Sequence, residues 1–233
     1  MEFVNKHKLT LKENIFLAKN QLVGTIYKQA RMENINITFP QTKVIFEQGI
    51  VNNINVSDIE KIVNLKRAWY RLLDTIGDPL SLEYIQKIHY DISLGEALVS
   101  GELRNGTVTV TGTNFVPDIP TRQDFLYFLD RLQNIENPID RALEYIAVGI
   151  RNQYFWECNK RTSFLIGNKI LIENGCGIVA VPENDLVEYN EKLTELFDNN
   201  NKEDFKCFLY NKEMVSIAFK ERREMAGDDI GED

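Results

Sequence analysis

The stretch that decides the fold covers residues 142–172, ALEYIAVGIRNQYFWECNKRTSFLIGNKILI. Its two outer parts, 142–150 and 164–172, are apolar on almost every side, which is typical of helices buried in a core. Between them lies the polar segment 153–162. Buried polar groups need hydrogen-bonding partners. The sequence therefore predicts two core helices with a dense polar cluster at their junction.

Outward from this stretch, apolar residues recur at three- and four-residue spacing, which predicts a mainly α-helical protein. Helix starts are indicated by Pro40, Ser57, Ser81 and Thr121, and helix ends by glycines. The predicted helices cover residues 12–32, 40–49, 57–76, 81–95, 121–134, 138–154, 160–174, 183–198 and 202–211. The charged residues 222–233 are expected to form a solvated tail.

The segment 101–117, GELRNGTVTVTGTNFVP, breaks the helical pattern. Alternation of threonine and valine with flanking glycines predicts a small β-hairpin. Two interpretations stay open. The segment is either an extended connector between helices or a hairpin with an unpaired edge that accepts an extended peptide.

Composition excludes several classes of protein. The 233 residues fit one compact domain or one domain with a small appendage, and 27 basic against 35 acidic side chains give a formal charge of −8. We therefore expect no general attraction to nucleic acid or anionic lipid. No 18-residue apolar run and no signal-peptide core occur. Three dispersed cysteines and two histidines predict no zinc site or disulfide framework, so a cytoplasmic protein with reduced thiols is expected.

The polar junction has the composition of an anion site. A loop that leads into a buried helix presents free backbone N–H groups and the positive end of the helix dipole. Lys160 and Arg161 at that position suit a bound nucleotide phosphate, and Glu157 suits a Mg²⁺ ion that bridges phosphates. The alternative is a simple turn in which Asn159 caps the helix and the charges face water.

The same residues resemble a known family signature. The segment 153–161, QYFWECNKR, is similar to the Fic/Doc (Fido) motif H-x-F-x-[D/E]-[G/A]-N-[G/K]-R. The segment 101–117 resembles the flap hairpin of that family. Met32-Glu33-Asn34 resembles its inhibitory motif [S/T]-x-x-x-E-[G/N]. The resemblance spans about residues 20–180 and implies an all-α Fic/Doc-like bundle with one small β-hairpin flap.

The resemblance also implies functional roles. It implies ATP and Mg²⁺ as cofactors and a protein target with a hydroxyl side chain. The net charge and the lack of a long apolar run predict no direct nucleic-acid partner and no membrane, and homo-oligomerisation stays open. The resemblance divides the chain into an N-terminal regulatory helical region (1–60), a Fic/Doc-like core (61–220) and an acidic tail (221–233). The implied residues are catalytic Gln153, Asn159 and Arg161; nucleotide-binding Cys158, Lys160 and Thr162 beside Asn159 and Arg161; metal-binding Glu157; regulatory Glu33 and Asn34; and target-binding Arg104, Thr107, Val108, Thr109 and Val110.

Four positions depart from the family pattern. Gln153 replaces the catalytic histidine, and glutamine cannot act as a general base near neutral pH. Cys158 replaces a small residue in the anion-holding loop. Phe164 replaces the second arginine, the usual partner of the inhibitory glutamate, and Gln29 stands where that motif has Ser or Thr.

Two hypotheses follow. The first is an enzyme that transfers AMP to a protein hydroxyl, weakened by Gln153, or a Doc-like phosphotransferase. The second is a catalytically silent module that keeps the nucleotide pocket or the flap for binding. Gln153 is the residue that separates the two.

Overall fold

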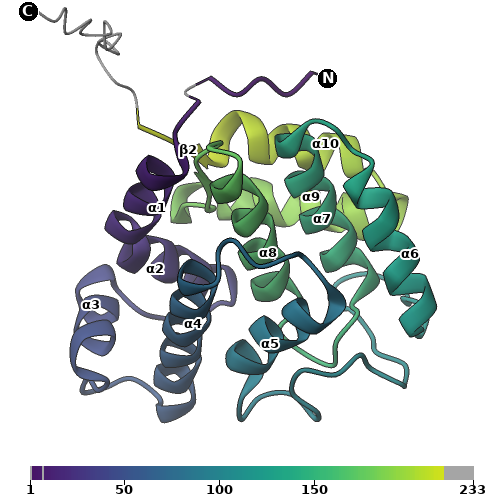
Figure 1. Cartoon of the computed structure of the whole chain (residues 1–233). Helices are drawn as coiled ribbons and strands as arrows, with labels where there is room; N and C mark the ends of the chain where they lie inside the picture. The colour runs from purple at the N-terminus through teal and green to yellow at the C-terminus, as the bar shows by residue number, and fades with distance from the viewer. Residues whose placement is uncertain (1, 7, 218–233) are drawn as a thin grey trace, which may run out of the picture.

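The computed structural model describes residues 2–6 and 8–217 (Figure 1). Over these residues the chain is mostly helical. The expected tail at 221–233 lies outside them. In chain order the elements are α1 (Leu11–Asn20), α2 (Leu22–Met32), α3 (Phe39–Gln48), α4 (Val56–Asp74), α5 (Leu82–Ser93), α6 (Arg122–Gln133), α7 (Pro138–Asn152), α8 (Asn159–Glu173), β1 (Ile178–Val179), the short 3₁₀ helix η1 (Glu183–Asp185), α9 (Leu186–Asn199), α10 (Lys202–Phe208), the π-helical turn η2 (Leu209–Glu213) and β2 (Met214–Val215).

The predicted fold class is confirmed: a mostly helical bundle with one small two-stranded antiparallel sheet. The strands lie elsewhere than predicted. β1 pairs with β2, with Ile178 opposite Val215 and Val179 opposite Met214. Residues 101–117 form no strand; they run as irregular, partly extended chain. The threonine–valine alternation favours extended backbone, but no second stretch pairs with it, and a lone hairpin gains too little from pairing to form.

Helix α8 is the centre of the molecule. Almost all of its side chains are buried, and α1, α4, α5 and α7 pack around it (Figure 1). The closest packing is with α7. A Cβ on Gly167 would lie 2.5 Å from the Ile146 side chain, so only glycine permits this approach. The start of α8 is therefore fixed in place by the core itself.

The N-terminal helices belong to the same core. Leu17, Ile26 and Ile45 of α1, α2 and α3 are buried in one continuous cluster with the residues of α8. The single helix predicted for 12–32 is broken at Gln21, whose backbone leaves the helical region. The predicted boundary near residue 60 stays a prediction.

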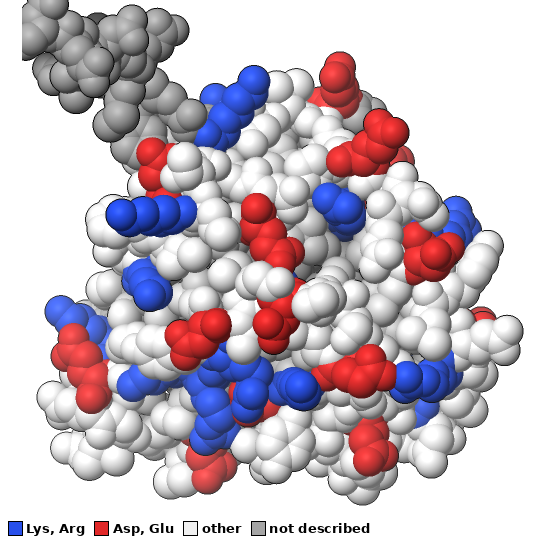
Figure 2. All heavy atoms as spheres, in the orientation of Figure 1, with Lys and Arg blue, Asp and Glu red and all other residues white. Residues whose placement is uncertain are grey.

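The surface carries both signs of charge. On the face shown in Figure 2, basic and acidic side chains are interspersed, and the blue cluster in its lower half is bordered by red. None of the helices in the described part of the chain is long and apolar enough to cross a membrane.

Candidate functional site

The loop between α7 and α8 is a tight turn bounded by two strained residues. Gln153 and Cys158 both have left-handed backbones, with φ of 48° and 59°. Such a conformation costs a non-glycine residue about 1–2 kcal/mol, so contacts around the turn must hold it. The Asn159 side chain supplies them. Its Oδ1 accepts from the Phe155 N–H at 2.9 Å, and its Nδ2 donates to the Phe155 carbonyl at 2.8 Å and to Gln153 Oε1 at 3.0 Å.

His89 of α5 supports the loop from below. Its ring stacks on Phe155, with centroids 3.9 Å apart and planes 12° from parallel. Nδ1 accepts the Gly101 N–H at 2.9 Å, so the neutral ring carries its proton on Nε2, which lies 3.1 Å from the Glu157 carbonyl oxygen. Burial lowers the pKa of His89 to about 4. The imidazole therefore joins the start of the 101–120 segment to the polar loop as a neutral group.

A cavity of about 500 Å³ opens beside the first turn of α8. It gathers predicted residues from three separate parts of the sequence, which are Glu33 and Asn34, Thr109 and Val110, and Gln153 with Glu157, Cys158, Asn159, Lys160 and Arg161. Its volume is in the range of small-ligand sites. Cys158 gives no side-chain cap to α8, so in the described structure the first N–H groups of that helix stay open to a ligand.

Arg161 lies between two carboxylates of this cavity region, those of Glu96 and Glu33. Arg161 is 5% exposed, and its guanidinium forms a bidentate pair with Glu96, at 2.7 and 2.8 Å. Arg161 Nε lies 3.8 Å from Glu33 Oε1 and has no hydrogen-bond partner among the described residues. Burial lowers the pKa of Arg161, but the hydrogen bond to Glu96 and the nearby charges outweigh it and raise the pKa overall. Arg161 is therefore a fixed cation with one uncommitted donor.

Glu33 has cationic partners although Phe164 replaces its usual one. Glu33 Oε2 lies 3.5 Å from Lys160 Nζ, which also donates to the Met32 carbonyl at 3.2 Å. Phe164 is fully buried and packs near Tyr189. Lys160 and Arg161 therefore both lie within ion-pair distance of Glu33, and Phe164, which is uncharged, forms no such pair.

Glu157 is exposed and faces the same cavity. Partial burial of its carboxyl group raises the pKa of Glu157 overall, although the nearby charge of Arg161 opposes the shift. In the part of the chain that the structure describes, no group of three or more His, Cys, Asp and Glu side chains could hold a metal. One carboxylate together with phosphate oxygens suits Mg²⁺, which keeps several waters. The donor set thus fits Mg²⁺ brought with a nucleotide better than a resident metal.

Gln153 and Cys158 are both unreactive at neutral pH. Gln153 Nε2 donates to the Ile150 carbonyl at 2.7 Å, and its Oε1 accepts from Asn159. Burial raises the pKa of the Cys158 thiol to about 12. Neither side chain offers a base or a nucleophile at neutral pH.

Four predicted site residues lie outside the cavity lining: Thr162, Arg104, Thr107 and Val108. Thr162 is buried, and its hydroxyl donates to the Cys158 carbonyl at 2.9 Å. Arg104, expected to face a target, is only 1% exposed. Its guanidinium donates to the carbonyls of Asn152, Gln153, Gly106, Pro117 and Asp118. Arg104 therefore anchors the 101–120 segment to the polar loop.

Sequence reasoning missed two sets of residues. Glu96 lies in a turn after α5, and nothing in its local pattern connects it with Arg161. The wall opposite α8 comes from α9, with Asn190, Leu193, Thr194 and Phe197. The spacing 190, 193, 194, 197 is one face of a helix, which was the available signal.

Comparisons with known proteins agree with this geometry. Residues 79–171 match the family model described as the Fic/DOC family. A Fic-domain-containing signaling protein from Bacteroides thetaiotaomicron superposes with a TM-score of 0.68 at 19% identity, covering 87% of this chain and 86% of that chain. Fic-1 from C. elegans gives 0.68 at 20% identity, covering 84% and 61%, and a Fic family protein from Desulfovibrio desulfuricans gives 0.63 at 17%, covering 86% and 62%.

At these identities the likeness shows the fold, and the match spans less than two thirds of the C. elegans and Desulfovibrio chains. No curated protein matches the sequence. The family-model match includes the loop 153–158 and helix α8, which form one side of the cavity, whereas Glu33, Asn34 and the α9 wall lie outside the match. The solved Fic proteins share the surrounding fold. Residues 79–171 therefore match the Fic/DOC family model, and the chain shares the fold of solved Fic proteins.

Proposed function

We propose that the cavity at the start of α8 binds a Mg²⁺-nucleotide, with ATP as the expected ligand, and that the protein transfers AMP slowly to a protein hydroxyl. The observation that carries this proposal is the convergence of Lys160, Arg161, Glu157 and the open N–H groups of α8 on one cavity. These are anion donors with a carboxylate suited to Mg²⁺.

In this proposal each side chain has a distinct task. Lys160 and the first N–H groups of α8 bind phosphate oxygens, and Arg161 contributes its positive charge; its buried Nε, now 3.8 Å from Glu33, becomes available only if that carboxylate is displaced. Glu157 holds the Mg²⁺ that accompanies the nucleotide. Asn159 is a positioning residue, because both ends of its amide are used to hold the loop.

The target hydroxyl would approach from the 109–113 side of the cavity. Its oxygen bonds to the α-phosphorus, the bond to the bridging oxygen of pyrophosphate breaks, and the hydroxyl proton passes to solvent. Gln153 cannot accept that proton. The lost acceleration is on the order of 10²–10⁴-fold where general-base catalysis limits the rate.

Glu33 supports a regulatory role within the same proposal. Its carboxylate lines the same cavity as the anion donors, 3.5 Å from Lys160 Nζ. A phosphate that binds Lys160 must displace this carboxylate or share its space. We therefore expect Glu33 to weaken nucleotide binding.

A second candidate function, a silent nucleotide-binding module, is favoured by one observation. Both polar atoms of the Gln153 side chain are committed to the loop. Such a module would bind the nucleotide without transferring any part of it.

Calorimetric titration with ATP and Mg²⁺ tests the binding step. We expect Glu33→Gln to bind more tightly than the parent and Lys160→Ala to bind more weakly. The matched control is Lys43→Ala, a lysine on α3 that faces Glu47 and is absent from the cavity lining. No binding by the parent and by Glu33→Gln would contradict a nucleotide site.

Labelling with ATP radiolabelled at the α-phosphate separates the two candidates. We expect Gln153→His to label itself or a lysate protein at least 10²-fold faster than the parent. Binding without labelling by both proteins would favour the silent module. Rapid labelling by the parent would show that the role given to Gln153 is wrong.

A further inference from the structure

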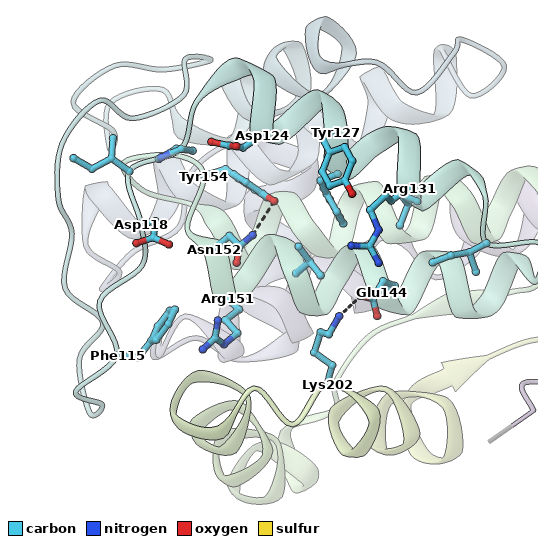
Figure 3. Close-up of a pocket in the computed structure, with 16 residues that line it drawn as sticks. Phe115, Asp118, Asp124, Tyr127, Arg131, Glu144, Arg151, Asn152, Tyr154 and Lys202 are labelled. Carbon is cyan, nitrogen blue, oxygen red and sulfur yellow. Dashed lines mark hydrogen bonds and ion pairs between the residues drawn. The ribbon is translucent and has the colours of Figure 1, made fainter.

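A second cavity, of about 550 Å³, shares no lining residue with the first, and Tyr154 is the one residue of the motif segment 153–161 that lines it (Figure 3). Helices α6 and α7 form its sides, the 115–120 segment closes one end and Lys202 at the start of α10 borders the other. Its size is sufficient for one or two amino-acid side chains.

The base of this cavity is apolar and aromatic. Phe128, Leu132, Val148 and Tyr154 line it. The rings of Phe128 and Tyr154 lie 6.0 Å apart and nearly parallel. On the rim Tyr127 is 64% exposed. The surface is therefore suited to an apolar or aromatic group.

One positive charge in this cavity is uncommitted. The Arg131 guanidinium extends from α6 toward Glu144 (Figure 3), yet it forms no hydrogen bond or ion pair with any described residue. Glu144 is already shared by Lys202 and by Lys206, the latter at 3.2 Å. Arg131 lies 5.9 Å from the Tyr127 ring, beside the apolar base.

Asp118 also lines the cavity, near Arg104 and Arg151, and its carboxylate forms no hydrogen bond or ion pair among the described residues. Asp124 and Arg151 are engaged. Asp124 accepts hydrogen bonds from the Thr121 hydroxyl and N–H, which caps α6. Arg151 donates to the carbonyls of Leu196 and Phe197 and stacks on Phe115 at 3.9 Å. The cavity therefore offers an apolar base with one free guanidinium, which is the complement of an apolar group next to a carboxylate.

We propose that this cavity binds an apolar or aromatic side chain followed by an acidic one, on an extended segment of the protein that receives the nucleotide group. The target protein is the expected source of this segment, because the two cavities are continuous along one stretch of chain. Residues 109–113 line the first cavity, and Phe115 and 118–120 line the second, so one stretch of chain borders both. An extended target lying along this stretch would reach both cavities. The identity of the occupant rests on the proposed function, whereas the chemistry of the cavity does not.

The test uses the full chain and two dipeptide probes, acetyl-Phe-Glu-amide and acetyl-Phe-Gln-amide, titrated with NMR detection. We expect the acidic dipeptide to bind at least about fivefold more tightly, a difference on the order of 1 kcal/mol, and to shift resonances of residues 115–154. Arg131→Gln should abolish the difference between the probes. The matched control is Arg122→Gln, on the same helix but paired with Glu83 outside the cavity.

Equal binding of the two probes, or shifts confined to other surfaces, would overturn the proposal, as would an Arg131→Gln variant that still discriminates. Nucleotide titration of the same samples separates this inference from the proposed function. If ATP binds but the dipeptides do not, only the docking site falls. If the acidic dipeptide binds but ATP does not, the cavity chemistry stands and its assignment to a nucleotide-accepting target falls.

Discussion

Two buried groups of this protein should oppose each other in the pH dependence of stability. Burial lowers the pKa of His89 to about 4 and raises the pKa of Glu213 to about 7. Glu213 is 1% exposed, and neither of its carboxyl oxygens has a hydrogen-bond partner among the described residues. The fold therefore favours the neutral form of each group, His89 above pH 4 and Glu213 below pH 7.

The signs follow from proton binding in the two states. Between pH 6.5 and 4 the unfolded chain protonates His89 and the native state does not, so acidification destabilises the protein. Glu213 has the opposite effect. Its contribution to the free energy of unfolding is complete below the unfolded pKa of 4.5 and is lost as the pH rises through about 7. When the pH falls from 7.5 to 5, protonation of His89 in the unfolded chain lowers the free energy of unfolding by about 2 kcal/mol, and Glu213 raises it by about 2 kcal/mol. Each unit of pKa difference is worth about 1.4 kcal/mol.

The prediction concerns differences between variants in urea unfolding followed by circular dichroism at pH 7.5 and pH 5. Glu213→Gln should lose about 2 kcal/mol more than the parent on acidification, because the His89 contribution is then unopposed. His89→Asn, which keeps an acceptor for the Gly101 N–H, should gain about 2 kcal/mol relative to the parent.

The double variant provides the control. With both contributions removed, its pH dependence should again run parallel to that of the parent, whatever its absolute stability. A Glu213→Gln variant with the pH dependence of the parent would refute the reasoning, since it would mean that Glu213 has the same pKa in both states.

Three further outcomes are expected. Arg104→Lys should lower the free energy of unfolding by about 2–4 kcal/mol, because lysine cannot reproduce the fork that donates to several carbonyls; the check is chemical unfolding together with limited proteolysis in 101–120. Gly167→Ala should cost about 1–3 kcal/mol through its clash with Ile146, measured as a lower unfolding midpoint. With Ellman's reagent at pH 8, Cys207 should react first, and the two buried thiols only on unfolding, since burial raises the pKa of both.

The sequence was most informative where one element is buried on all sides. The apolar stretches 142–150 and 164–172 predict α7 and α8, and the polar residues between them predict the cavity, because a polar junction inside a core has few other arrangements. The break at Gln21 was not predictable, since neither glycine nor proline marks it.

Contacts between residues far apart in the sequence could not be predicted from local sequence patterns. The pair of Glu96 with Arg161 joins residues 65 positions apart, and its partners are chosen by the packing of α5 on α8. The hairpin prediction failed for a related reason. Alternation in 107–110 shows a preference for extended backbone, but a strand also needs a partner, and here Arg104 satisfies the neighbouring carbonyls instead.

The way in which Arg104 holds the 101–120 segment has an evolutionary consequence. The base of the segment is fixed by that guanidinium and by the contact of Gly106 with Trp156, where a Cβ would lie 2.6 Å from the ring. Its tip around Thr109 and Thr111 is exposed and adds little to the core. Substitutions at the tip can therefore accumulate at small cost in stability. Partner choice can drift there while the fold stays under selection.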